Sequence, residues 1–185
     1  DKDLKLFRET TEKYETSEFL VLTLTDTKKE IFDKQNLDLI NKISEEIKKN
    51  ELVKTVTTIA NIPLVTSSNK PLTELVNDIP NILSDDVDKE SAREEILSSP
   101  IYKNLIISED AKTTAMQIII KDNIELKNAS FDYYDIKRKF EKNKITKNEY
   151  LLSKRKYELL KQSHDTNLHN LIKEVHLIKE NIIIA

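Results

Sequence analysis

Three histidines on one predicted helix are the first residues that could do chemistry. His164, His169 and His176 lie near Asp165 and Glu174, and imidazole and carboxylate groups are common metal ligands. Two ligands on one helical face usually stand four residues apart, whereas these histidines follow one another at five and seven residues. The spacing therefore predicts no metal site, and we expect His164 to pack between helices.

The acidic stretch "SDDVDKE" is a second candidate for metal binding. Asp86, Asp88 and Glu90 alternate as they would at the start of a calcium loop, but the glycine and the distal glutamate of such a loop are missing. Acidic residues are also typical of helix N-termini, where they interact favourably with the helix dipole. We therefore expect a helix to begin here, without a bound metal.

The residue types that are absent exclude several classes of enzyme. The 185-residue chain has no cysteine, so disulfides, thiolate nucleophiles and Cys-ligated zinc are impossible. It also has no glycine, which phosphate-binding loops, dinucleotide fingerprints and nucleophile elbows all require. Serine and histidine occur, but no oxyanion loop can be identified. The sequence predicts no catalytic residue, no cofactor and no enzyme activity.

Aromatic side chains are concentrated between residues 131 and 140. Tyr133 and Phe140 belong to a set with alternating spacings of three and four, which predicts a seam for a partner helix. The set comprises Leu126, Ala129, Tyr133, Ile136 and Phe140. Phe131 and Tyr134 fall outside it and are possible contacts for a hydrophobic or lipid substrate. The alternative is that they also belong to a core, as aromatic residues at helical spacing usually do.

Positive charge is concentrated in residues 137–161, where ten basic residues accompany three acidic ones. A solvated helix face more often mixes the two signs, so the excess indicates an anionic partner, either an acidic carrier or periplasmic protein or lipid head groups. The predicted contact residues are Lys139, Lys142, Lys154 and Arg155. A lysine-rich arm that is merely soluble is the alternative.

Charge and hydropathy also bear on partners and location. The formal net charge is −3, with −7 in residues 1–120 and +4 in residues 121–185, which indicates two surfaces with different partners. Because the overall charge is negative and no binding module is recognised, we expect no nucleic-acid partner. No window approaches the roughly 20 apolar residues of a membrane helix, and no signal segment is visible. The chain begins at Asp1 rather than Met, which is typical of a fragment of a longer protein.

Alternating and helical apolar patterns predict the elements that position these residues. "EFLVLTLT", near 18–26, is apolar on both faces, so we expect a central strand. "NLDLINKISEEIKKN" is an amphipathic helix that should turn Ile40, Ile43 and Ile47 toward the sheet. A second strand near 52–60 completes a strand-helix-strand unit, in which the strands normally run parallel.

Prolines punctuate the middle of the chain, and helical periodicity returns after it. "NKPLTELVNDIP" and "DVDKESAREEILSS" read as short helices, and "TTAMQIIIK" as a third strand near 112–121. A helix follows from Glu125 and is broken at "EKNK". Thr146 and Glu149 then form a capping-box signature for a longer second helix. The two helices should form an antiparallel hairpin, whose overhang near 166–181 could pack on the sheet.

Residues 98–123, "SSPIYKNLIISEDAKTTAMQIIIKDN", resemble a segment of the porter domain of RND-superfamily exporters of the MMPL-like type. There, a helix that ends in Pro leads through an L-[IV]-S-x-D-G-x-x-T turn into a strand. The matching residues are Pro100, Leu105, Ile107, Ser108, Asp110 and Thr114. Ala111 stands where the pattern usually has Gly, and since Ala tolerates a left-handed conformation poorly, such a conformation is not expected there. "IFDKQNLDLINKISEEIKKNELVKTVTTIANIP" is similar to the family's first helix, V-x-x-V strand and sL-x-N-x-P exit.

The resemblance implies an α+β fold: a ferredoxin-like (split βαβ) porter subdomain in residues 1–124, with an inserted antiparallel helical hairpin at 125–165. Residues 166–185 would return to the sheet as a helix, and "IIIA" would start a last strand. The implied protein is a proton-driven exporter of the inner membrane that moves hydrophobic or amphipathic substrates such as lipids. This chain would be periplasmic, and its partners would include the membrane helices of its own full-length protein. The alternative is a soluble helical-hairpin adaptor with a small α/β scaffold.

Overall fold

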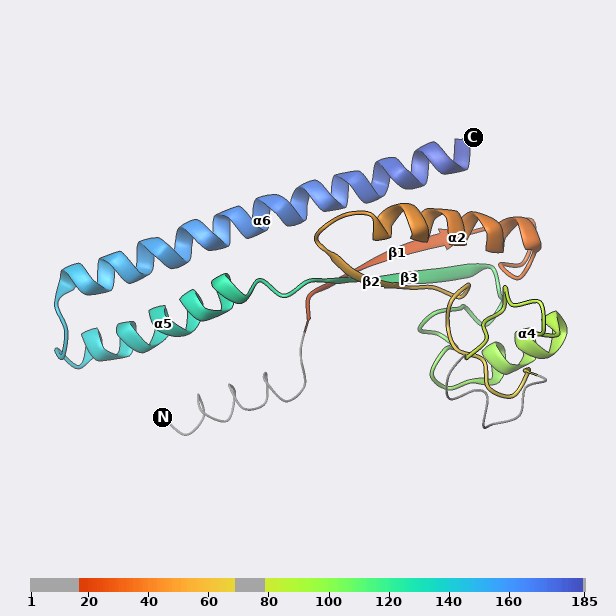
Figure 1. Cartoon of the computed structure of the whole chain (residues 1–185), viewed down its shortest axis with the longest axis horizontal. Coiled ribbons are helices and arrows are strands. Elements are labelled where there is room, and N and C mark those ends of the chain that lie inside the picture. The colour runs from red at the N-terminus through yellow and green to blue at the C-terminus, as the bar shows by residue number, and fades with distance from the viewer. Residues whose placement is uncertain (1–16, 69–78, 185) are drawn as a thin grey trace. The chain divides into compact units, whose positions relative to one another are not determined.

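A computed structural model describes residues 17–68 and 79–184 of the chain and gives it an α+β fold (Figure 1). The helices and strands are β1 (Phe19–Thr25), α2 (Lys34–Lys48), β2 (Val53–Thr57), α4 (Lys89–Ser98), β3 (Thr113–Ile120), α5 (Ile124–Glu141) and α6 (Lys147–Ile184). They belong to two compact units, one of residues 1–120 and 177–185 and one of residues 121–176. The α+β class is as predicted, whereas most of the short helix expected in "NKPLTELVNDIP" lies outside the described residues.

The first unit contains a three-stranded sheet in the order β1-β3-β2, in which both outer strands run antiparallel to β3. All three predicted strands are present, and β3 pairs with β1 from Phe19↔Ile119 to Thr25↔Thr113. β1 and β2 therefore run in the same direction, but they are separated by β3.

The expectation that the strand near 18–26 is central is wrong, because β3 has that place in the described sheet. The apolar run of β1 is not buried on two faces: Leu22 and Leu24 are buried, whereas Phe19 and Val21 are 56% and 57% exposed. Apolar residues on both faces predicted a central strand, but β1 is buried on one face only.

The core lies between the sheet and α2, which runs along one face of the sheet (Figure 1). Ile40, Ile43 and Ile47 of α2 are buried, as predicted from the helical spacing, and they share the core with Met116 and Ile118 of β3. Asp33 caps the helix by accepting a hydrogen bond from the Gln35 amide at 3.0 Å. The apolar stripe of α2 and these side chains of β3 are therefore both buried.

Ala111 adopts a left-handed conformation, with φ of 55°, contrary to the expectation for a residue with a Cβ atom. It lies in the turn before β3, where its carbonyl accepts a hydrogen bond from the Ile31 amide at 2.8 Å and its amide donates to the Ser108 carbonyl at 3.0 Å. Ser108 Oγ in turn donates to Asp110 Oδ1 at 2.6 Å and accepts from the Thr113 amide at 2.9 Å. These hydrogen bonds hold the backbone in a conformation that the residue type alone disfavours.

The second unit contains most of the helical hairpin. Ring contacts pair Tyr133 with Tyr157 and Phe140 with Tyr150, so residue numbers rise along α5 as they fall along α6, which makes the helices antiparallel. The predicted capping box is confirmed: the Thr146 amide donates to Glu149 Oε2 at 2.8 Å, and the Glu149 amide donates to Thr146 Oγ1 at 3.3 Å.

The predicted start of a last strand in "IIIA" does not occur, because α6 is helical through Ile184. β-Branched residues favour a strand in isolation, but no Gly or Pro interrupts the sequence between Lys147 and the C-terminus. Once a long helix is formed, each further residue adds a hydrogen bond, so the helix continues through the isoleucines.

The burial of α2 predicts a large loss of stability when its apolar side chains are shortened. Ile43→Ala and Ile47→Ala should each lower the free energy of unfolding by about 2–5 kcal/mol, because both side chains are fully buried and their removal leaves a cavity. Urea denaturation measures the change. Ile101→Ala is the control, since Ile101 is 68% exposed, and it should cost less than about 0.5 kcal/mol. Equal effects at the three positions would place α2 away from the sheet.

The left-handed turn predicts an unusual response to glycine. Ala111→Gly should relieve about 1–2 kcal/mol of backbone strain, lose about 0.8 kcal/mol of methyl burial and cost about 0.5–1 kcal/mol in unfolded-state entropy, so its stability should stay close to that of the wild type. Ala115→Gly in the extended β3 is the control and should destabilise by about 0.5–1 kcal/mol. Thermal unfolding compares the two variants. A greater loss for Ala111→Gly than for Ala115→Gly would contradict the positive φ.

Candidate contact surfaces of the two units

A cluster of aromatic rings joins the two arms of the hairpin. The rings of Tyr133 and Tyr157 stack with centroids 5.1 Å apart and planes at 9°, and those of Phe140 and Tyr150 stack at 4.8 Å and 8°. The prediction that Tyr133 and Phe140 form a helix seam is confirmed. A hydrogen bond with Tyr150 and burial raise the pKa of Tyr133 to about 12, so its hydroxyl stays protonated at neutral pH. The cluster is a packing core of the hairpin.

The two predicted substrate contacts differ in their surroundings. Tyr134 joins the aromatic cluster, with its ring 5.1 Å from that of Tyr133 and 6.1 Å from that of Tyr157, yet it is 45% exposed. Phe131 is half-buried. Tyr134 therefore offers one accessible aromatic edge beside the seam, and a role of either residue in substrate contact stays a prediction.

The turn between α5 and α6 is built without glycine. Asn143 has φ of 54°, its amide donates to the Phe140 carbonyl at 2.9 Å, and the Lys144 amide donates to the Lys139 carbonyl at 2.9 Å. This pair of hydrogen bonds is the Schellman motif, which usually needs Gly at the left-handed position and in which Asn is the common substitute. The motif and the capping box after it fix the backbone that carries Lys142, Lys144 and Lys147.

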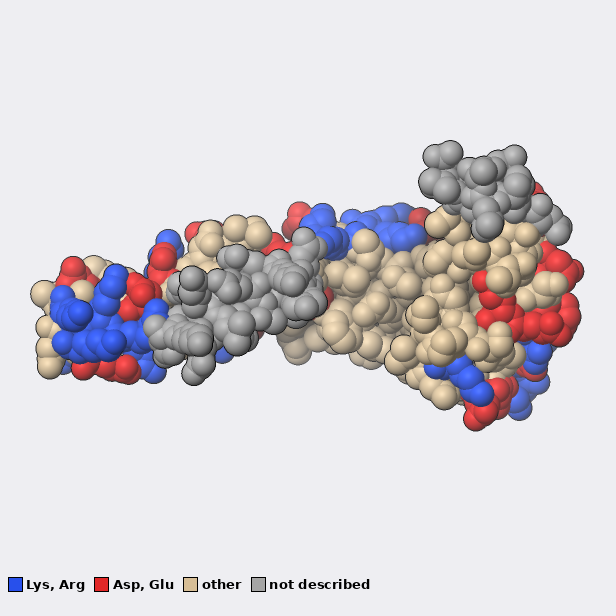
Figure 2. All heavy atoms as spheres, turned by 90° about the horizontal axis from the view of Figure 1, so that it is seen from below, with Lys and Arg blue, Asp and Glu red and all other residues tan. Residues whose placement is uncertain are grey.

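The basic side chains near this turn fall into two groups. Lys139 forms an ion pair with Asp135 at 2.7 Å, and Lys154 forms one with Glu158 at 3.6 Å. Arg138 also forms an ion pair with Asp135, at 3.0 Å. The other seven basic residues of 137–161 take part in no ion pair within the described part of the chain: Lys137, Lys142, Lys144, Lys147, Arg155, Lys156 and Lys161. Figure 2 shows basic side chains gathered over this end of the hairpin, with acidic ones beside them.

Two of the four predicted partner contacts, Lys142 and Arg155, are thus uncompensated, and the other two have neighbouring acids. Exposed ion pairs of this kind contribute about 0–1 kcal/mol to stability. Lys139 and Lys154 could therefore leave Asp135 and Glu158 and bind an acidic partner at little cost in free energy. Hydrogen bonds from Lys139, and further charges nearby, lower the pKa of Asp135 below its usual value. The structure brings all four residues to one end of the hairpin, and their contact with a partner stays a prediction.

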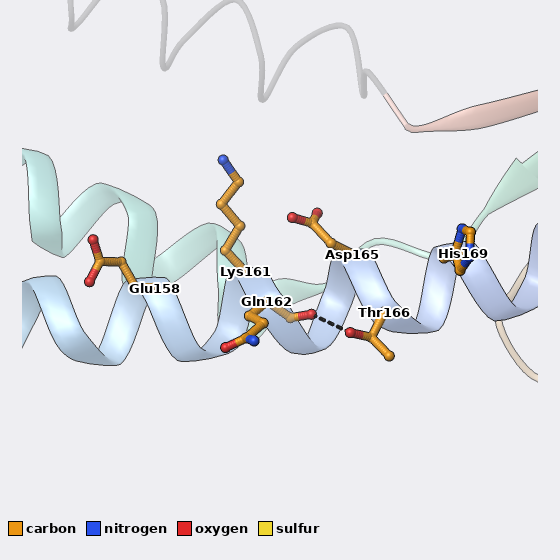
Figure 3. A pocket seen from close by; sticks show the side chains of 6 residues that line it. All are labelled: Glu158, Lys161, Gln162, Asp165, Thr166 and His169. Atoms are coloured by element: carbon orange, nitrogen blue, oxygen red, sulfur yellow. Dashed lines mark hydrogen bonds between the residues drawn. The ribbon is translucent and has the colours of Figure 1, made fainter.

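The histidines do not form a metal site in the described residues, where no three His, Asp or Glu side chains lie close enough to hold an ion. His164 is half-buried, whereas His169 and His176 are exposed. His169 lies at one end of a surface hollow of about 420 Å³ whose lining side chains all come from α6 (Figure 3). They are Glu158, Lys161, Gln162, Asp165, Thr166 and His169. The Thr166 hydroxyl donates to the Gln162 carbonyl at 2.9 Å, so it is already satisfied by its own helix.

The acidic stretch "SDDVDKE" starts a helix, as predicted. Asp88 is the N-cap of α4, where its Oδ2 accepts from the Ser91 amide at 2.8 Å, and Glu90 lies in the first turn. This hydrogen bond is the main reason why the pKa of Asp88 is lowered. Asp88 and Glu90 thus belong to the start of α4.

A pocket of about 350 Å³ that no sequence pattern indicates lies beside the end of β1, within the sheet unit. It is lined by Leu24, Thr25, Asp26, Thr27, Lys28, Ile31, Asn36, Leu39, Ile40 and Ile183. Asp26 is its one acid, and hydrogen bonds from the Asn36 side chain and the Lys28 and Lys29 amides lower its pKa to about 2. Those donors already occupy the carboxylate, and the pocket offers a ligand a mixture of apolar and polar side chains.

Glu95 of α4 anchors the loop after β2. Its Oε1 accepts from the Val65 amide at 2.8 Å, and its Oε2 accepts from the Thr66 amide at 3.1 Å and from both the amide and the hydroxyl of Ser67 at 2.7 Å. Burial by itself would raise the pKa of Glu95, but the hydrogen bonds outweigh it and lower the pKa to about 2. Sequence inspection missed this clamp because its partners lie 28–30 residues away.

Comparison with known proteins gave no match: no family model, no curated protein and no solved structure is significantly similar to this chain. Within residues 17–68 and 79–184, no helix combines the length and the apolar character that crossing a membrane requires. The described residues offer two candidate contact surfaces: a basic and partly apolar hairpin, and a small pocket at the edge of the sheet.

The clamp predicts a pH-dependent contribution to stability. Glu95→Gln should lower the free energy of unfolding at pH 7 by about 1.5–3 kcal/mol, since hydrogen bonds to a charged group are lost. The folded-state pKa of Glu95 is below its ordinary value of 4.5, so its contribution is full above pH 4.5 and is lost as the pH falls through about 2. Urea denaturation at several pH values should show the gap between wild type and variant shrinking over this range. Glu94→Gln, an exposed neighbour, should cost less than about 0.5 kcal/mol, and a pH-independent gap for Glu95→Gln would contradict the clamp.

Proposed function

We propose that this chain is an extracytoplasmic porter domain of an RND-type, MMPL-like exporter, and that it forms part of the path of a hydrophobic or amphipathic substrate such as a lipid. The observation that carries the proposal is the turn before β3. Ala111 occupies the pattern's glycine position and has a φ of 55°, the conformation for which glycine is usually selected. The side chains of Ser108 and Asp110, which belong to the same pattern, hold this turn through their hydrogen bond at 2.6 Å.

The strand order supports the finer fold that the proposal requires. In a ferredoxin-like split βαβ unit, two strands joined by a helix lie on either side of a third strand. Here β1 and β2 are joined through α2 and flank β3, to which both are antiparallel. We therefore propose that the sheet unit is the split βαβ subdomain of a porter domain.

The described surfaces are compatible with a domain that contacts the substrate but does not itself drive transport. The resemblance places the proton-relay acids of such exporters in membrane helices, so this domain would not move protons itself. The exporter would lie in the inner membrane with this chain on the periplasmic side, and the domain would change shape as the membrane helices move. The pocket of about 350 Å³ beside β1 and α2 offers a hydrophobic substrate five apolar side chains together with polar ones; the apolar ones are Leu24, Ile31, Leu39, Ile40 and Ile183.

The hairpin would be the contact surface for a partner protein. Its seven basic residues without an ion pair in the described part of the chain favour an anionic partner, a periplasmic carrier or another acidic protein. The same observation favours the second candidate function, a helical-hairpin adaptor whose α/β unit is only a scaffold. The two candidates differ in whether the complete protein places this chain outside an inner membrane.

Cysteine labelling in intact cells tests that location, and the absence of cysteine from this chain makes it specific. Leu105 is 68% exposed, so Leu105→Cys in the full-length protein, with any other cysteine replaced, should react with a membrane-impermeant maleimide added to the periplasmic side. Ile96→Cys is the control, because Ile96 is fully buried and its thiol should react only after denaturation.

Labelling of Leu105→Cys that requires rupture of the inner membrane would sink the exporter proposal and leave the adaptor. The full-length sequence gives an independent check, since an exporter needs apolar segments of about 20 residues flanking this chain.

A further inference from the structure

The outward face of α6 carries a narrow strip of exposed leucine that the hairpin seam does not use. Leu152 and Leu159 are 70% and 58% exposed, although Leu is an apolar residue that folded proteins usually bury. At 100° per residue, Leu159 returns to within about 20° of Leu152, two turns and about 10 Å further along the helix. The ring contacts with α5 are made by Tyr150 and Tyr157, which lie about 140–160° away from Leu152 by the same geometry.

Two cations flank this strip. Lys156 lies about 40° to one side of Leu152 and Arg155 about 60° to the other, and both are exposed. Neither takes part in an ion pair in the part of the chain that the structure describes, because Glu158, the nearest acid along α6, is paired with Lys154. Leu152 and Leu159 stand one heptad apart, as residues at one of the two apolar positions of a coiled-coil heptad do, and charges beside such positions set the choice of partner helix.

We propose that this strip is the docking site for a partner helix of acidic character, which would complete a three-helix bundle with α5 and α6. The partner would present apolar residues at heptad spacing to Leu152 and Leu159, with Asp or Glu beside Arg155 and Lys156. The proposal rests on the part of the proposed function that makes the hairpin a contact surface, and it does not require export.

The shape and charge of the strip favour this occupant over two others. An interfacial membrane helix needs an apolar face at least about 100° wide, whereas the strip is one side chain wide and has a cation on each side. A second copy of the hairpin would bring the same cations face to face, which like-charge repulsion disfavours. An acidic helix can bury the two leucines with its apolar residues and form ion pairs with the two cations.

Binding of a synthetic helical peptide of about three heptads tests the proposal. The peptide carries Leu at the a and d positions and Glu at the e and g positions, and a second peptide carries Lys in place of Glu. Fluorescence anisotropy with the purified 185-residue chain should detect binding of the acidic peptide only, weakened as the salt concentration is raised from about 0.1 M to 1 M.

Matched variants locate the site on α6. Leu152→Ser and Lys156→Glu should each weaken the binding of the acidic peptide tenfold or more. Leu151→Ser and Lys161→Glu are the controls: Leu151 is 46% exposed but lies about 100° from the strip, and Lys161 lies on the opposite side of the helix. Both controls should bind within twofold of wild type, and circular dichroism should find all four variants equally helical.

Each other outcome overturns the proposal. No binding of the acidic peptide, or equal loss in the strip variants and the controls, would exclude a helix-docking site at Leu152. Binding to vesicles with about 30% anionic lipid that depends on Leu152, without binding to the peptide, would assign the strip to a membrane surface. Self-association that depends on Leu152, measured by sedimentation, would assign it to a second copy. None of these measurements uses export or location, so they fail or succeed independently of the cysteine labelling.

Discussion

The pairing of β3 on both of its edges is the interaction on which the sheet unit depends. β3 is hydrogen-bonded to β1 along one edge and to β2 along the other. Neither outer strand has another partner in the described sheet. The β3 side chains Met116 and Ile118 are fully buried, as are Ile43 and Ile47 of α2 in the same unit. A strand held from two sides can support both neighbours and a helix, whereas an edge strand supports one neighbour. The turn at Ala111 matters for the same reason, because it delivers the chain into β3.

The protein makes its sharp turns without glycine by placing hydrogen bonds around other residues. Asn104, Ala111 and Asn143 are the described residues with positive φ, at 64°, 55° and 54°. Asn tolerates this region through local hydrogen bonding, as at Asn143 in the Schellman motif. Ala has no such side chain, so at Ala111 the backbone hydrogen bonds must offset the strain: the Ile31 amide donates to the Ala111 carbonyl, and the Ala111 amide donates to the Ser108 carbonyl. The unusual composition is therefore compatible with ordinary turn geometry.

The hairpin separates cohesion from recognition on different faces of its helices. Stacked rings such as Tyr133 and Tyr157 hold the arms together, and the exposed charges and leucines lie outside this seam. An aromatic seam suits a two-helix unit because each large ring buries much surface in a small contact. The cations can be numerous because they lie outside this seam, where water screens their mutual repulsion. The same arm can thus be stable and still present Leu152, Arg155 and Lys156 outward.

The amino-acid sequence by itself determined the elements whose causes are local. The three strands, the burial of Ile40, Ile43 and Ile47, the Thr146–Glu149 capping box and the seam through Tyr133 follow from residue spacing along a few turns or one strand. Only the tertiary structure decided which strand is central, since the apolar run of β1 reads the same whether one or two faces are covered. It also decided that Ala111 is left-handed and that Glu95 clamps a loop about 30 residues away, because both depend on hydrogen bonds between distant segments. The helical end of α6 has the same origin: cooperative extension of a long helix overcomes the strand preference of its last isoleucines.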